Sequence, residues 1–232
     1  MSSATLSAQL GGLFPPGAVV AELCEPGDPE LLLPAEAIQV ARAVPKRVRE
    51  FAAGRLCARR ALAEFGIAGF AIGVAADRQP IWPPHMIGSI THTADFAAAA
   101  VAERICMPAI GIDSEIVGHV NAEIWPAICI PSETAWIRSL PASEQAAAVT
   151  LIFSAKEAFY KCQYPLVAER LNFHDVRVEA APWGATAGAF RIHPMRRLSL
   201  AAQFSLPVEG RYRFHAEFVT AGVGLSAGVT CG

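Results

Sequence analysis

Hydrophobic and polar positions in the first half of the chain predict a helix between short strands. Apolar residues recur at helical spacing over residues 46–65, and Gly66 behind them is suited to end a helix in a left-handed conformation. A shorter helix is expected over residues 35–44, ahead of Pro45. Extended apolar runs predict strands at residues 18–23, 88–93, 97–102 and 109–116.

The second half repeats the order of helices followed by strands. Residues 131–148 are helical in character, and a further helix is expected to start at Ser154 and to stop near Tyr164, because Pro165 cannot continue it. Residues 211–219 alternate aromatic with charged positions and predict one strand, with a turn at 208–210. The repeated order predicts an α+β protein with two similar halves, residues 1–105 and 106–232, in one compact unit.

Composition removes several classes of protein. Hydrophobic residues make up 53% of the 232 positions and charged residues 17%, which excludes a disordered chain. No apolar run approaches the roughly 20 residues of a membrane span, and no basic leader opens the chain, so a cytoplasmic protein is expected. The six cysteines show no metal-type or C-x-x-C spacing and are expected to be buried free thiols.

The net charge of −2 excludes a chain-wide attraction to nucleic acid, but the charge is unevenly distributed. Residues 46–60 hold six basic side chains and one acid, Glu50. This basic helix is either a solvated face or an anion site. Arginine binds phosphate as a planar fork, and aromatic residues are too few for a nucleic-acid surface, so the anion would be a small polyphosphate.

Two acids in the strand at 109–116 are candidates for a metal site. Asp113 and Glu115 project to the same face because strand side chains alternate. Carboxylates at that spacing repel one another unless a cation lies between them, and Mg²⁺ suits such oxygen ligands. The alternative is an exposed strand face with two solvated acids.

Glu157 and His92 each have an ordinary structural interpretation. Ser154 and Glu157 have the spacing of a capping box, and Glu157 and Lys161 have the i,i+4 spacing of a helix ion pair. His92, in a short strand, belongs to no histidine metal pattern. Spacing alone favours capping and pairing for Glu157 over metal binding.

Five blocks of the chain resemble the 4′-phosphopantetheinyl transferases, in the Sfp-type branch and its siderophore-synthase (EntD-like) subgroup. In order they are R-E-F-A-A-G-R at 49–55, P-I-W-P at 80–83, G-S-I-T-H-T at 88–93, G-I-D-S-E at 111–115 and F-S-A-K-E-A-F-Y-K at 153–161. The last two blocks, in this order, are the most specific. The resemblance implies two pseudo-symmetric halves, each a small antiparallel sheet packed with a helix, with the active site at their interface.

The resemblance also implies a reaction: transfer of 4′-phosphopantetheine from coenzyme A to a serine of an apo acyl or peptidyl carrier protein, with release of 3′,5′-ADP. The N-terminal half would take the nucleotide and the C-terminal half the metal and the carrier. The enzyme is expected to be a monomer that binds neither nucleic acid nor membrane. Siderophore, peptide, polyketide and fatty-acid carriers all remain open.

Site residues follow from the resemblance by position. Three acids would hold Mg²⁺ against the pyrophosphate: Asp113, Glu115 and Glu157. Glu157, directly or through water, would also be the base for the carrier serine, and Lys161 would act on the pyrophosphate. The remaining residues expected to bind coenzyme A are Arg47, Arg55, Thr91, His92 near the 3′-phosphate, Lys156 as an assisting cation, and Arg78, whose register is looser.

Two positions depart from the family pattern. His85 stands where many relatives have glycine, and Thr93 replaces a more usual serine or cysteine. Two other functions share the carboxylates and the basic helix: another Mg²⁺-dependent enzyme that acts on a nucleotide pyrophosphate, such as a hydrolase, and a non-catalytic binding module.

Overall fold

The protein is described by a computed structural model covering residues 4–93, 95–180 and 182–226. The α-helices are α1 Ala8–Gly11, α2 Pro34–Ala37, α3 Pro45–Ala63, α4 Trp125–Ile128, α5 Pro131–Ser139 and α6 Ala142–Val167. The strands are β1 Thr5–Leu6, β2 Ala18–Leu23, β3 Gly73–Val74, β4 Pro80–Ile81, β5 Met86–His92, β6 Ala97–Glu103, β7 Ala109–Ile116, β8 Val176–Glu179, β9 Ala187–Pro194, β10 Val208–His215 and β11 Phe218–Leu225.

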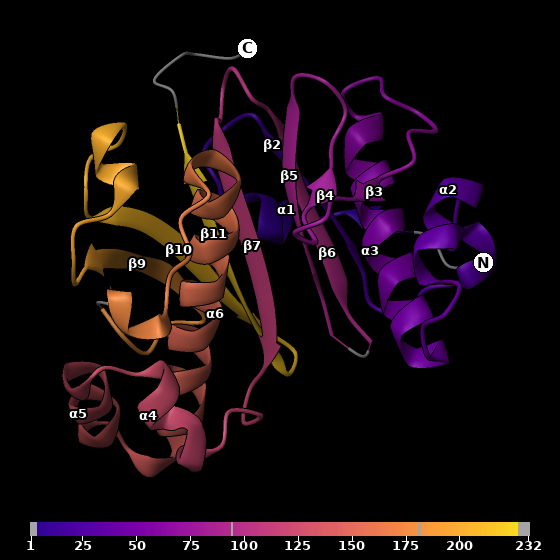
Figure 1. The fold of residues 1–232 in the computed structure, drawn as a ribbon. Coiled ribbons are helices and arrows are strands. Elements are labelled where there is room, and N and C mark those ends of the chain that lie inside the picture. Colours follow the sequence, from indigo (N-terminus) through magenta and orange to yellow (C-terminus); the bar gives the residue numbers. More distant parts are fainter. Residues whose placement is uncertain (1–3, 94, 181, 227–232) are drawn as a thin grey trace.

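Two antiparallel sheets, each with a long helix on its outer face, form the body of the molecule (Figure 1). One sheet has the strand order β1-β2-β6-β5 and packs against α3. The other has the order β7-β11-β10-β9-β8 and packs against α6. In Figure 1, α3 and the first sheet lie on the right, and α6 and the second sheet lie on the left. The expected α+β class with a helix on each antiparallel sheet is confirmed.

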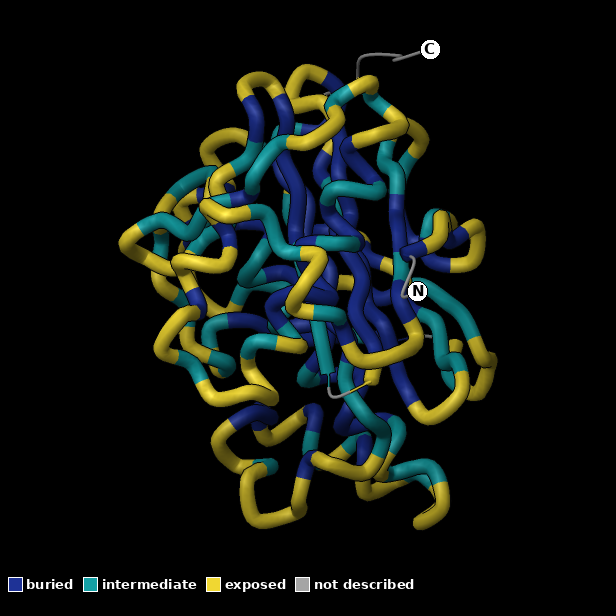
Figure 2. Tube along the Cα trace, turned by 90° about the vertical axis from the view of Figure 1, so that its right-hand side faces the viewer, coloured by how far each residue is buried: buried dark blue, intermediate teal, exposed yellow. Residues whose placement is uncertain are grey.

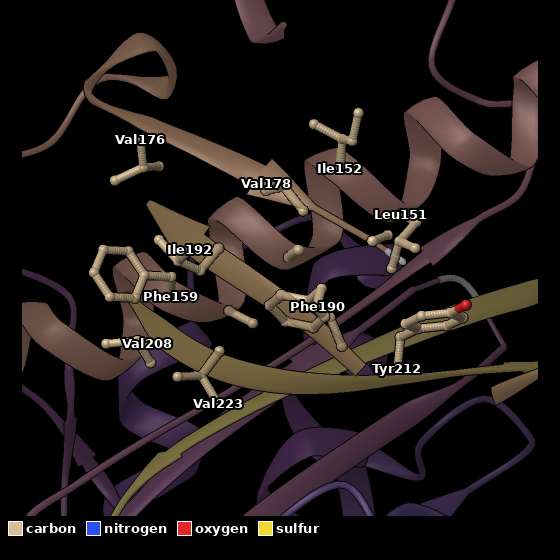
Figure 3. Close-up of a cluster of buried hydrophobic side chains, with 14 of the residues drawn as sticks. Leu151, Ile152, Phe159, Val176, Val178, Phe190, Ile192, Val208, Tyr212 and Val223 are labelled. Atoms are coloured by element: carbon tan, nitrogen blue, oxygen red, sulfur yellow. The ribbon is translucent and has the colours of Figure 1, made fainter. Parts of the chain in front are cut away.

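Three apolar clusters hold these layers together. One lies under α3, one lies between the two sheets, and the largest lies under α6. Figure 3 shows the last of these, where Leu151, Ile152 and Phe159 of α6 face the aromatic and branched side chains of β8, β9 and β10. Figure 2 shows the buried strands running through the centre of the molecule, with exposed loops around them. No helix among the described residues is long and apolar enough to cross a membrane.

The two sheets meet where the edge strands β5 and β7 lie side by side. The backbone N–H of Ile112 donates to Oγ of Ser89 at 3.1 Å, and that of Ser114 donates to Oγ1 of Thr91 at 2.9 Å. Side chains of the first sheet thus satisfy the free edge of β7, which would otherwise leave buried donors without partners. This junction places β7, with its two acids, between the halves.

Several expected elements agree with the structure. The strands at 18–23 and 109–116 coincide with β2 and β7, the other two strands match β5 and β6 within two residues at each end, and the helix at 46–65 is α3. Gly66 has the expected positive φ of 72°. Residues 35–44 are only partly helical, as α2 followed by a 3₁₀ turn over Ile38–Val40.

The helix expected to begin at Ser154 is wrong at both ends. α6 starts at Ala142 and continues through Pro165 to Val167. Ser154 is therefore mid-helix and fully buried, and its hydroxyl donates to the backbone carbonyl of Asp113 at 2.9 Å instead of capping. The capping-box interpretation fails because the alanine-rich residues upstream extend the helix past the local cap signal.

The single strand expected at 211–219 is wrong as well. Residues 211–219 instead span the turn of a hairpin. β10 ends at His215, Ala216 in the turn has a φ of 48°, and β11 starts at Phe218. The turn expected at 208–210 lies inside β10.

The cysteines are less uniform than expected. Cys57, Cys129 and Cys162 are buried free thiols, whereas Cys24 is free but exposed. Cys106 is disulfide-bonded, which corrects the expectation of a free thiol there. Cys231 lies outside the described residues.

Gly111 allows β7 to approach α6 closely. A Cβ at this position would collide with the carbonyl oxygen of Ala158 and lie 2.6 Å from the amide nitrogen of Cys162, both in the helix backbone. We expect Gly111→Ala to lower the free energy of unfolding by about 1–3 kcal/mol, because neither backbone can yield without disturbing the core. Denaturant unfolding measures this. Gly11→Ala is the matched control, since its Cβ would meet nothing within 4 Å, and equal losses in the two variants would contradict the prediction.

Candidate functional site

A cavity of about 1220 Å³ opens between α3, the segment 74–92 and the C-terminal part of α6. Its lining is strongly basic: six Lys or Arg side chains and one carboxylate, Asp77, contribute to it among the described residues. The basic residues are Arg47, Arg55, Arg78, Arg104, Lys161 and Arg170. A concave wall with this excess of positive charge suits a highly charged anion.

At the α3 side of the cavity, Arg47 and His92 meet. Nη1 of Arg47 lies 2.7 Å from Nε2 of His92, and the Glu50 carboxylate lies 3.6 Å from Arg47 and 3.8 Å from His92. Burial, assisted by the charge of Arg47, lowers the pKa of His92 to about 4. A neutral imidazole can accept the hydrogen bond that Arg47 donates, so the pair holds one fixed cation at the cavity wall.

Arg55 is the most buried of the basic residues on α3. Its Nε donates to the carbonyl of Ile72 at 2.9 Å, and its guanidinium lies 4.0 Å from the centre of the Phe51 ring. Burial lowers its pKa to about 10. The other two cations further along this helix have structural partners: Arg59 pairs with buried Glu36, and Arg60 pairs with Glu64. The basic helix is thus neither a uniformly solvated face nor a uniform anion site.

The loop opposite α3 holds two basic residues with unusual backbone. Arg78 has a φ of 72° in a turn closed by the N–H of Arg78 donating to the carbonyl of Ala75 at 2.9 Å. His85 has a φ of 65°, and its carbonyl accepts from the N–H of Arg104 at 2.8 Å. Both residues line the cavity, and because non-glycine residues seldom adopt this conformation, their placement there has a local conformational cost.

Lys161 connects the cavity to the acidic strand. Its ammonium donates to Oδ1 of Asp113 at 2.7 Å and to the carbonyl of Ile112 at 3.2 Å. Lys161 lines the cavity while Asp113, only 4% exposed, lies behind it. The ion pair that the structure gives to Lys161 is therefore with Asp113 rather than with Glu157, and the alternative of a solvated strand face does not hold for Asp113.

The three acids influence one another although Asp113 and Glu115 come from β7 and Glu157 comes from α6. Burial first, then the charges of Asp113 and Glu157, raises the pKa of Glu115 to about 7. Burial and Asp113 likewise raise the pKa of Glu157. Oδ2 of Asp113 is buried and has no hydrogen-bond partner. An orphaned carboxylate oxygen beside two carboxyls that resist ionisation has the chemistry of a site that a divalent cation would complete.

The side chains as they stand do not form a closed metal centre. Among the residues that the structure describes, no group of three or more His, Cys, Asp or Glu side chains is close enough to hold an ion.

Two predicted site residues have buried structural partners and do not line this cavity. Thr91 is 3% exposed, its hydroxyl accepts from β7, and it does not line the cavity. Lys156 is also buried, and its ammonium is shared among the carboxylate of Glu133 at 2.7 Å and the carbonyls of Ile128 and Phe173, both at 2.8 Å. Arg47, Arg55, Arg78, His92 and Lys161 are brought together at this cavity, and Thr91 is not. Lys156 does not line it either, but lines a second cavity together with Glu157.

Several lining residues had not been expected. They are the basic Arg104 and Arg170 and the aromatic Trp82, Tyr160 and Tyr164. The two tyrosines stack with ring centres 5.3 Å apart. The i,i+4 spacing of the two tyrosines on a helix is the one feature of the sequence that indicates their contact. Arg104 follows β6 and Arg170 follows α6, and only the fold brings these two arginines to the same cavity.

A second cavity, of about 550 Å³, lies on the other side of Tyr160. Tyr160 lines both cavities, and Glu157 lines the second one. The remaining wall comes largely from residues 171–176, which follow α6. Tyr160, Lys161 and Glu157 therefore lie where the two cavities adjoin, and the ion pair of Lys161 joins this place to Asp113.

Two protein-family models match the chain. The model of the 4′-phosphopantetheinyl transferase N-terminal domain matches residues 34–102, and that of the 4′-phosphopantetheinyl transferase superfamily matches residues 109–213. Together they cover both halves of the cavity. The chain belongs to the 4′-phosphopantetheinyl transferase superfamily, and the expected class of enzyme is confirmed.

Curated relatives agree with this assignment. The chain is 38% identical to 4′-phosphopantetheinyl transferase Svp of Streptomyces mobaraensis, over 73% of this chain and 70% of the relative. It is 37% identical to 4′-phosphopantetheinyl transferase Npt of Nocardia iowensis, over 72% and 74%. Enterobactin synthase component D of Escherichia coli K12 is 37% identical over 53% of this chain and 58% of that protein, in line with the Sfp-type and EntD-like resemblance.

A solved structure is similar over part of the fold. Holo-[acyl-carrier-protein] synthase of Thermotoga maritima aligns over 52% of this chain and 64% of its own, with a TM-score of 0.39 and 19% identity. This likeness is too distant to assign a role to any residue.

Proposed function

We propose that this protein transfers the 4′-phosphopantetheine group of coenzyme A to a serine of an apo carrier protein and releases 3′,5′-ADP. The observation that carries the proposal is the basic cavity, which adjoins a buried carboxylate with an orphaned oxygen in a chain of this superfamily. Coenzyme A carries three phosphates, so six cationic side chains around one cavity suit its nucleotide end.

The donor would lie across both cavities. In this arrangement Arg47, Arg55 and Arg78 bind the nucleotide phosphates in the larger cavity, with neutral His92 as a hydrogen-bonding neighbour of Arg47. Lys161 contacts the pyrophosphate, and the pantetheine arm passes Tyr160 into the smaller cavity. This placement puts the bond to be broken beside Asp113 and Glu157.

Asp113, Glu115 and Glu157 are our proposed ligands for Mg²⁺. The fit rests on the unpartnered Oδ2 of Asp113 and on the raised pKa values of the two glutamates, whose ionised forms a cation would stabilise. Bound there, Mg²⁺ would neutralise charge on the pyrophosphate and on the departing 3′,5′-ADP.

The protein's own groups would then carry the transfer. The serine oxygen of the carrier attacks the phosphorus that bears the pantetheine arm, and the bond from that phosphorus to the oxygen of 3′,5′-ADP breaks. Glu157, directly or through water, would accept the proton that the serine loses, since its side chain lines the smaller cavity. Lys161 stabilises the negative charge that moves onto the leaving oxygen.

Partner and compartment are proposed on the same basis. The carrier is an acyl or peptidyl carrier protein from siderophore, peptide, polyketide or fatty-acid synthesis, and an acidic surface around its serine would complement the basic site. The enzyme would act as a monomer in the cytoplasm, with residues 1–105 on the nucleotide side and 106–232 on the metal and carrier side.

Replacing Arg47 tests the donor site. We expect Arg47→Ala to weaken coenzyme A binding by about tenfold to a hundredfold, the range for a lost charge-assisted hydrogen bond, as measured by calorimetry. Lys46→Ala is the matched control, because its side chain is 71% exposed, comes from the same helix turn and does not line the cavity. Equal affinities in the two variants would argue against nucleotide binding at this wall.

Nucleotide product analysis tests the function itself. The protein is incubated with coenzyme A and Mg²⁺, with and without several apo carriers, and 3′,5′-ADP is quantified. The proposal predicts release only when a carrier is present. Release without a carrier would indicate a hydrolase, and Mg²⁺-dependent binding of coenzyme A without any release would indicate a binding module.

A further inference from the structure

The segment 168–175, which we call the strap, forms a wall shared by both cavities. Arg170 lines the larger cavity, and residues 171–175 line the smaller one. The strap begins where α6 ends, at Ala168 with a φ of 52°, and ends at a 3₁₀ turn over Phe173–Asp175. Its position therefore affects the shape of both cavities at once.

Side chains of α6 contact the inner side of the strap. Nζ of Lys156 donates to the carbonyl of Phe173 at 2.8 Å, and Nε2 of Gln163 donates to the carbonyl of Glu169 at 2.7 Å. The rings of Phe153 and Phe173 lie 5.5 Å apart. These contacts come from α6 and hold single points of the strap.

From outside, one arginine spans the whole strap. Arg196, in the loop after β9, pairs with Glu169 at 2.6 Å and with Asp175 at 3.0 Å and 3.2 Å through two different nitrogens. It also donates to the carbonyl of Arg170 at 3.4 Å. The guanidinium thus joins the first part, the middle and the end of the strap.

The carboxylates of Glu169 and Asp175 also accept hydrogen bonds from backbone N–H groups. Oε2 of Glu169 accepts from the N–H of Ser199 at 2.7 Å, and Oδ2 of Asp175 accepts from the N–H of Asn172 at 2.8 Å. The N–H of Met195 donates to the carbonyl of Asp175 at 2.9 Å. The strap and the segment 195–199 are therefore one hydrogen-bonded unit centred on Arg196.

Stability alone is a poor reason for such a site. Glu169 and Asp175 are only 17% and 18% exposed, but Arg196 is 39% exposed, and water and salt weaken ion pairs at that exposure. A planar guanidinium with several donors in fixed directions is instead suited to fixing geometry.

We propose that Arg196 is a positioning residue for donor binding: it holds the strap in the conformation that shapes the two adjoining cavities for coenzyme A. The proposal rests on the proposed function for the identity of the ligand. It does not require Arg196 to touch the donor, because Arg196 lines neither cavity.

The test compares Arg196→Ala with Arg197→Ala in the full-length protein. Arg197 is the adjacent exposed arginine, and only its backbone carbonyl, which the substitution keeps, takes part in the unit. For Arg196→Ala we expect the KM for coenzyme A to rise roughly tenfold, kcat to change less than about twofold, and the thermal midpoint to match that of the control. Arg196→Lys keeps the charge but not the fork and should fall between the two.

Hydrogen exchange supplies a readout independent of activity. Peptides covering 168–175 and 195–199 should exchange faster in Arg196→Ala than in Arg197→Ala, because the acceptors for Asn172, Met195 and Ser199 are no longer held. Equal KM values together with equal exchange rates in the two variants would overturn the proposal. An Arg196→Ala protein in which KM rises while kcat and the thermal midpoint both fall would overturn it as well.

The two proposals can fail separately. A wild-type protein without transferase activity would refute the proposed function. The dissociation constant for coenzyme A, measured by calorimetry, and the exchange of the strap would then decide the role of Arg196: unequal values in the two variants support it, and equal values refute it.

Discussion

Asp113→Ala is expected to reduce transferase activity by about a thousandfold while the protein stays folded, because the variant loses the proposed metal ligand that has an unpartnered oxygen. The change removes a buried oxygen that has no partner, but it also removes the ion-pair partner of Lys161. Because the Lys161 side chain is 30% exposed and keeps the carbonyl of Ile112 as an acceptor, the thermal midpoint should fall only modestly. Carrier modification measured by intact mass, together with a thermal melt, gives both values.

A control variant and a binding measurement make this prediction specific. Glu209→Ala removes an exposed carboxylate from β10 of the same sheet and should leave activity unchanged. The Mg²⁺-dependent part of coenzyme A binding, measured by calorimetry, should disappear in Asp113→Ala and persist in Glu209→Ala. An Asp113→Ala protein with full activity would refute the metal assignment.

Lys156→Met is expected to have the largest effect on stability. The Lys156 and Glu133 side chains are each only 1% exposed, and Glu133 also accepts from the N–H groups of Ile130 and Val178. Removal of the ammonium leaves a buried carboxylate without its counter-charge, which costs about 3–5 kcal/mol. Denaturant unfolding measures the loss.

An exposed ion pair serves as the comparison. Arg60→Met breaks the i,i+4 pair with Glu64 on the surface of α3 and should cost only about 0.3–0.5 kcal/mol. Similar losses in the two variants would mean that Lys156 is not a structural group and would restore its expected role at the donor site.

The parts of the fold with local signals could be predicted from the sequence. β7 is an apolar run of strand length, and α3 is bounded by Pro45 and Gly66, so the sequence predicts both elements. The helix predicted within α6 is too short at both ends, because Ser154 with Glu157 has the spacing of a cap and Pro165 is typical of a helix terminator. In the structure it lies in the last turn, where the missing N–H costs a single hydrogen bond.

The hairpin of β10 and β11 was missed for a different reason. Its turn uses Ala216 with a positive φ, where glycine or asparagine would have signalled a reversal, and the alternation of side chains continues across it. No spacing rule separates such a turn from an uninterrupted strand.

The candidate site was only partly accessible to sequence reasoning. The resemblance of five blocks led to Arg47, Arg55, His92 and Lys161, which do line one cavity. Lys156 has a structural role because it pairs with Glu133, 23 positions upstream, and only tertiary packing brings the two together. Arg170 lines the cavity because the loop after α6 packs there, which no local pattern indicates.

The intact mass of an apo carrier protein after incubation with this protein, coenzyme A and Mg²⁺ tests the central claim most directly. The account predicts that one carrier molecule gains one phosphopantetheine group, that a carrier whose target serine is replaced by alanine gains nothing, and that a chelator of Mg²⁺ stops the gain. Unmodified carriers throughout a panel drawn from siderophore, peptide, polyketide and fatty-acid systems would contradict it.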